Sequence, residues 1–83
     1  MGLGRLYRPM ITPAQCRAAR GLLRWSQEEL ADRSDVGLST IKKLEAELTA
    51  APRKSTLKVL RATFEAHGVA FLDENGGGVK LKG

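Results

Sequence analysis

Apolar residues recur at helical spacing through most of the chain and at strand spacing near its C-terminus. From Thr12 onward they return every three or four positions, which is the period of an amphipathic helix. After residue 68 the period changes. VAFL is apolar, DENGGG is rich in turn residues, and VKLK alternates strictly between apolar and basic residues. The pattern therefore predicts a mainly helical unit over residues 12–68 and a β-hairpin extension over residues 69–83.

The first helix is predicted from its start signal. Thr12 is a good N-cap, Pro13 suits the first helical position, and Gln15 completes a capping box with Thr12. We expect this helix to continue to about Leu23. One face of it carries the apolar residues Cys16, Ala19 and Leu23.

A second helix begins only a few residues later. Ser26 is the expected N-cap, and Glu29 stands at the capping-box position three residues on. Trp25 and Leu30 occupy the two positions of a hydrophobic staple, so Trp25 is interpreted as a clasp between helices. We expect this helix to end near Ser34.

A turn and a third helix follow directly. In the turn SDVG, residues 34–37, Asp35 can adopt the left-handed conformation that a tight connection requires. The third helix is predicted over residues 38–47. Its expected buried stripe consists of Ile41, Leu44 and Leu48, and its expected exposed face consists of Ser39, Lys42, Lys43 and Ala46.

The fourth helix is predicted to begin with Ser55 as its cap and to end near His67, with Gly68 as its stop signal. Its expected core stripe consists of Leu57, Leu60 and Phe64. A lone hairpin is only marginally stable in water. The hairpin after Gly68 should therefore pack on the helices or pair with a second subunit.

Composition and charge narrow the class of protein. The 83 residues allow one small domain, and the formal net charge of +5 suits a polyanionic partner such as nucleic acid. The first 11 residues contain glycine, proline and arginine without periodicity, which predicts a flexible basic arm. Cys16 is the only cysteine and His67 the only histidine, so we expect no metal site, no cofactor and no enzymatic activity. No signal peptide or membrane span is evident, which favours a cytoplasmic location.

The run SQEELADRSDVGLSTIKKLE resembles the helix-turn-helix of the XRE family, whose phage relatives include the Cro and cI repressors. The resemblance covers residues 12 to about 67. Residues at the family's spacing are Ser26, Gln27, Leu30, Ala31, Val36, Ile41 and Glu45. The resemblance implies a mainly α, lambda-repressor-like fold of about four helices, with the hairpin in place of the family's common fifth helix.

The resemblance also implies a DNA-binding surface. The helix from Leu38 would lie in the major groove, with its exposed side chains near base edges or the adjacent backbone. The candidate contacts to DNA are Gln27, Leu38, Ser39, Lys42, Lys43, Arg53 and Lys54. Gln27, Arg53 and Lys54 would contact phosphates. Leu38 cannot hydrogen-bond a base edge, but it can contact a thymine methyl group.

Arg20 and Glu45 match a pair that in relatives forms a partly buried ion pair between the first and third helices. The residues themselves agree, because Glu45 falls at the rim of an apolar stripe, where an unpaired carboxylate is costly. The chain departs from the family at Gly37, which replaces a capping Ser or Thr, and at Asp35, which replaces the usual turn glycine.

Two functions follow from this reading. The first is a sequence-specific, double-stranded DNA-binding transcriptional regulator, expected to be a repressor and a homodimer, with the hairpin as the candidate dimer contact. The alternative is a protein-interaction module, such as an antitoxin or adaptor, whose hairpin binds a partner protein. An exposed apolar cluster on the third helix would favour the alternative, and its exposed face does not supply one.

Overall fold

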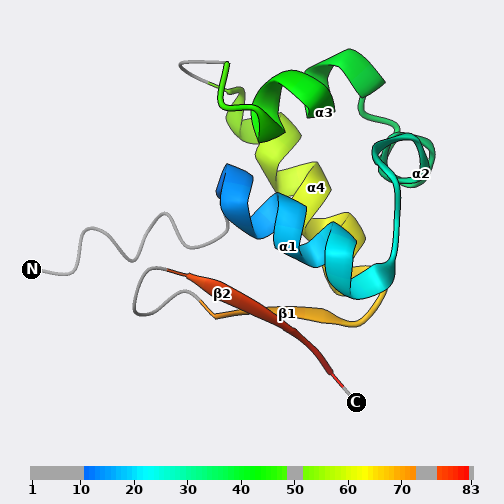
Figure 1. Cartoon of the computed structure of the whole chain (residues 1–83), viewed down its shortest axis with the longest axis vertical. Helices are drawn as coiled ribbons and strands as arrows, with labels where there is room; N and C mark the ends of the chain where they lie inside the picture. The colour runs from blue at the N-terminus through cyan, green and yellow to red at the C-terminus, as the bar shows by residue number, and fades with distance from the viewer. Residues whose placement is uncertain (1–10, 49–51, 73–76, 83) are drawn as a thin grey trace, which may run out of the picture.

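A computed structural model describes residues 11–48, 52–72 and 77–82. These residues form helices and one two-stranded antiparallel sheet, so the expected mainly helical fold with a C-terminal hairpin is confirmed (Figure 1). The elements are α1 (Pro13–Leu23), α2 (Gln27–Ser34), α3 (Leu38–Glu45), α4 (Lys54–Ala66), β1 (Val69–Leu72) and β2 (Gly78–Leu81). No helix in the described ranges is both long and apolar enough to cross a membrane.

The start and end of α1 are set by local hydrogen bonds. The Gln15 N–H donates to Thr12 Oγ1, and the Thr12 N–H donates to Gln15 Oε1, both at 3.0 Å, which confirms the predicted capping box. At the other end Arg24 adopts the left-handed conformation with φ 59°, and the Trp25 N–H donates to the Arg20 carbonyl at 2.9 Å. This bond turns the chain sharply away from α1.

Ser26 caps α2 as predicted, because its Oγ accepts a hydrogen bond from the Glu29 N–H at 3.0 Å. The Glu29 carboxylate does not complete the box. It pairs with Arg33 one turn later on the same helix, at 2.5 Å. Asp35 ends α2 in the left-handed conformation with φ 64°, which confirms the predicted turn.

The core lies where α1, α2, α3, α4 and the hairpin meet. Its buried apolar members are Ile11, Cys16, Ala19, Leu30, Ile41, Leu44, Leu57, Leu60, Phe64 and Val69. Trp25 packs against this core, stacked on Phe64 with ring centroids 5.8 Å apart and edge-on to His67 at 4.8 Å. The Arg33 guanidinium lies 4.8 Å from the centre of the same indole. Trp25 therefore joins the start of α2 to the end of α4, as the predicted clasp should.

The prediction was wrong at the end of α3. The helix ends at Glu45 rather than at residue 47, and Leu48, expected in the buried stripe, is 76% exposed. Glu47 adopts φ 59°, and the Leu48 N–H donates back to the Lys43 carbonyl at 2.9 Å. This pair of features is a Schellman motif, which reverses the chain direction. Leu48 is turned away from the core because it follows that reversal.

The start of α4 also differs from the prediction. Arg53, with extended backbone, occupies the N-cap position without a side-chain cap, and Ser55, the predicted cap, lies inside the first turn. The predicted stripe of Leu57, Leu60 and Phe64 is buried. Gly68, with φ 93°, ends the helical segment as expected.

Replacing Glu47 with glycine is expected to stabilise the domain by about 0.5–1 kcal/mol, because glycine adopts a left-handed backbone at little steric cost. The ion pair lost with Glu47, 3.6 Å from Arg17, is largely exposed and contributes little. Urea unfolding measures the change. As a matched control, Glu28→Gly in α2 should destabilise by about 1 kcal/mol. A Glu47→Gly variant less stable than the parent would contradict the assignment of strain to this turn.

The hairpin packs against the helices, as the sequence analysis allowed. Its register pairs Val69 with Leu81 and Phe71 with Val79, and Figure 1 shows both strands beneath α1 and α4. β2 contacts α1, and β1 contacts α4. Ile11, the last residue of the expected arm, is buried in the core. The rest of that arm, residues 1–10, and part of the expected turn, residues 73–76, lie outside the described residues.

Candidate nucleic-acid interface

The outward face of α3 is polar and basic. Ser39, Lys42 and Lys43 are all exposed, and Leu38 is half-buried where the helix begins. The buried residues Ile41, Leu44 and Glu45 lie on the opposite side. In Figure 1, α3 lies at the end of the molecule remote from the hairpin, with α1 and α4 between them. The α3 candidates therefore share one surface that no described element covers.

A buried carboxylate fastens this helix to α1 and α2. Glu45 accepts two hydrogen bonds from Arg20, from Nε to Oε2 at 2.8 Å and from Nη2 to Oε1 at 2.7 Å. Cys16 Sγ–H donates to Oε2, and Gln27 Nε2–H donates to Oε1, each at 3.1 Å. The Arg20 guanidinium also donates to the Trp25 carbonyl at 2.9 Å. Glu45 thus joins three helices, and the two-bond geometry with Arg20 is the strong form of this interaction.

The charge state of this cluster follows from its bonds. Burial alone raises the pKa of the Glu45 carboxyl, but hydrogen bonds from Arg20, Cys16 and Gln27 outweigh burial and hold the pKa below its ordinary value. The hydrogen bond to Glu45 raises the pKa of Arg20. Burial, followed by the bond to Glu45, raises the pKa of the Cys16 thiol. Cys16 is therefore a protonated donor at neutral pH, and it fills core space as well.

Gln27, the candidate at the start of α2, is held by this cluster. One N–H of its carboxamide is used by Glu45, and the side chain is half-buried. A carboxamide nitrogen carries two N–H groups, so one remains for another acceptor. The position is the first residue of α2, where backbone N–H groups also point out of the helix.

Arg53 and Lys54 lie at the start of α4, and both are exposed. The first turn of α4 has no acidic residue, and Arg53 makes no side-chain cap. A helix N-terminus carries a partial positive charge from its free N–H groups, which suits an anion. The two cations therefore reinforce an electrostatic preference that the helix already has.

Sequence reasoning missed three contacts to Glu45 and one further residue of the polar face of α3. Cys16 and Gln27 were not expected to bond Glu45. Arg17 was not expected to donate to the Glu45 carbonyl at the end of α3. Thr40, in the first turn of α3, is exposed beside Ser39 and presents a further hydroxyl. A helical wheel of α3 would have placed Thr40 at the edge of the polar face; the other contacts have no local sequence signal.

Comparison with known proteins agrees with this geometry. A family model described as helix-turn-helix matches residues 17–66, which include the second half of α1 and all of α2, the turn, α3 and α4. A comparison with curated proteins found no match. Within the described ranges, no group of histidine, cysteine, aspartate and glutamate side chains is arranged to hold a metal ion.

Proposed function

Because this chain belongs to the XRE family of helix-turn-helix proteins, which are DNA-binding transcription regulators, we propose that it reads specific duplex sequences with α3 and represses transcription. Ser39, Lys42 and Lys43 contact base edges or the adjacent backbone, and Leu38 contacts a thymine methyl group. Gln27, Arg53 and Lys54 contact phosphates on either side and set the register of α3.

The observation that carries this proposal is the basic, uncovered face of α3 together with the cluster that fixes its orientation. A recognition helix discriminates bases only if its side chains are held in a constant position relative to the groove. The four side-chain bonds to Glu45 supply that constraint from α1 and α2. Small residues such as Ser39 and Ala46 leave room for a close approach to the bases.

We further propose that the regulator acts as a homodimer on a two-fold symmetric site. Half-sites would then be spaced by about 10 base pairs, one turn of DNA, or a multiple of it. A second copy also adds buried surface to a domain whose core is small. Repression follows if the dimer occupies a site that overlaps a promoter.

The test is selection of bound duplexes from a random DNA library at about physiological salt. Enrichment of a two-fold symmetric motif is the expected result, and its half-site spacing gives the geometry of the dimer. A symmetric motif together with a monomer in solution at micromolar concentration would mean that dimerisation occurs only on DNA. Binding without any enriched motif would overturn the proposal of sequence-specific reading.

A further inference from the structure

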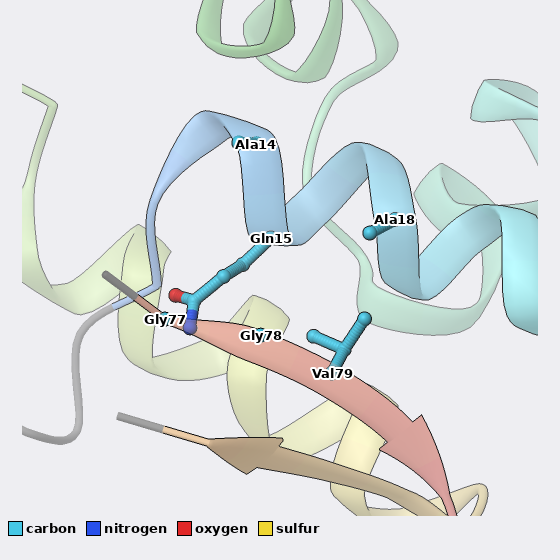
Figure 2. A pocket seen from close by; sticks show the side chains of 6 residues that line it. All are labelled: Ala14, Gln15, Ala18, Gly77, Gly78 and Val79. Atoms are coloured by element: carbon cyan, nitrogen blue, oxygen red, sulfur yellow. The ribbon is translucent and has the colours of Figure 1, made fainter. Parts of the chain in front are cut away.

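A cleft of about 170 Å³ separates the first turns of α1 from the start of β2 (Figure 2). Its lining residues are Ala14, Gln15, Ala18, Gly77, Gly78 and Val79. Pockets for drug-sized ligands measure roughly 300–1,000 Å³, whereas an apolar cavity of about 150 Å³ accepts a group the size of benzene. The cleft therefore suits one apolar side chain delivered by a larger molecule.

One polar group is directed into this cleft. Gln15 is only 4% exposed, and Figure 2 shows its carboxamide extending from α1 to Gly77. Its Oε1 already accepts from the Thr12 N–H, and the other end of the carboxamide, Nε2, lies beside Gly77. A Cβ at residue 77 would lie 2.8 Å from Nε2, so a glycine there keeps the carboxamide in place. Gln15 thus offers an N–H donor to an acceptor such as a peptide carbonyl.

The edge of β2 beside the cleft pairs with no strand of residues 11–48, 52–72 or 77–82. The Lys82 N–H donates to the Gly68 carbonyl at 2.7 Å, and ladder bonds in an antiparallel pair recur at every second residue. The N–H and C=O groups of Val79 and Leu81 therefore point away from β1. In the part of the chain that the structure describes, the sheet has two strands, so these groups face an edge to which a third strand can bind.

The apolar residues of α1 and those of β2 that flank this edge are spaced at similar distances along their elements. Ala14, Ala18 and Leu22 form one stripe of α1, with about 6 Å between successive members. Val79 and Leu81 share the helix-facing side of β2, since they pair with Phe71 and the buried Val69, and alternate strand residues lie roughly 6.6 Å apart. Leu22 and Leu81 are 37% and 48% exposed, so both rows of residues are still open to a partner. An added strand would contact both rows with every second side chain.

The positive charges on β2 favour an acidic strand as the segment that binds at this edge. Lys80 and Lys82 are exposed and stand beside the open edge. A second copy that paired through β2 would set lysine against lysine, which is unfavourable across an antiparallel pair. The cleft and the adjoining edge of β2 together form a slot between α1 and β2. We propose that this slot binds an extended, acidic segment of a partner protein as a third strand. One apolar side chain of that segment would enter the cleft, and one of its carbonyl groups would accept a hydrogen bond from Gln15. This interaction is separate from DNA binding, because α3 lies at the opposite end of the molecule.

The probe is a fluorescent nine-residue peptide in which valine and glutamate alternate, titrated against the full chain by fluorescence anisotropy. We expect saturable binding at micromolar to millimolar concentration. The same peptide with lysine in place of glutamate should bind at least tenfold more weakly. Ala18→Arg fills the cleft from an exposed helix position and should weaken binding of the acidic peptide at least tenfold.

Charge reversal provides the matched control. Lys80→Glu with Lys82→Glu should abolish binding of the acidic peptide, whereas Lys42→Glu with Lys43→Glu, an equal change of net charge on α3, should preserve most of it. Circular dichroism checks that each variant is folded. Absence of binding to the parent chain at millimolar peptide, or equal loss in both double variants, would overturn the proposal. Ala18→Arg should leave DNA affinity unchanged, so failure here is separate from failure of the DNA-binding function.

Discussion

Replacing Glu45 with alanine is expected to destabilise the domain by about 3–5 kcal/mol, the loss that follows when one partner of a buried ion pair is removed. The variant leaves Arg20, Cys16 and Gln27 without their shared acceptor. Small domains have free energies of unfolding of about 5–15 kcal/mol, so the variant would lose a large part of the total stability. Urea unfolding followed by circular dichroism measures the effect. Glu28→Ala, at an exposed position of α2, should cost less than about 1 kcal/mol.

A double variant separates pairing from packing. Arg20→Met combined with Glu45→Met removes both charges and keeps most of the volume. The double variant should therefore recover a large part of the stability lost in Arg20→Met alone or in Glu45→Met alone. If the two single losses simply add in the double variant, the ion pair is not the source of the effect.

The same carboxylate predicts a dependence on pH. The pKa of Glu45 is lowered in the folded state, so its contribution to stability is fully present above the pKa of an unfolded glutamate. That contribution is lost as the pH falls through the lowered folded value. The free energy of unfolding of the parent should therefore decrease more steeply with acidification below about pH 4.5 than that of Glu45→Gln. Parallel curves for the two proteins would contradict the assigned charge state.

Removing both lysines from the face of α3 is expected to weaken binding to the selected duplex roughly a hundredfold. A lost base contact costs about 1–3 kcal/mol, and a lost phosphate contact also reduces the slope of log affinity against log salt by about one. Alanine is the best helix former, so Lys42→Ala with Lys43→Ala should remain folded. Fluorescence anisotropy at several salt concentrations measures both quantities. It also shows whether the two lysines read bases, because only loss of a base contact changes the ratio of affinities for the selected and scrambled duplexes.

The matched control removes two lysines from the other end of the molecule. Lys80→Ala with Lys82→Ala produces the same change in net charge on β2 and should change affinity by only a few fold. A similar loss in both double variants would mean that DNA responds to overall charge, and the assignment of α3 as the reading helix would fail.

Most local elements of this protein were determined by its sequence alone, although the cap predicted for α4 and the end predicted for α3 were wrong. The cap at Thr12, the cap at Ser26 and the left-handed turn at Asp35 depend on partners three or four residues away, and all three are present. The period of apolar residues likewise predicted four helices, the hairpin and most of the core. The DNA-contact residues were named from the motif, and their role stays a prediction.

The tertiary structure decided what depends on distant residues. Glu45 meets Cys16, Arg20 and Gln27 across 29, 25 and 18 positions of sequence, and no local pattern encodes which donors converge on it. A local feature was also missed at the end of α3, where Leu48 continues the apolar period but is exposed because the left-handed Glu47 reverses the chain first. The slot between α1 and β2 exists only because residues some 60 positions apart pack together. Short-range hydrogen bonds can be inferred from neighbouring residues, whereas the meeting of distant side chains is set by how the helices and the hairpin pack.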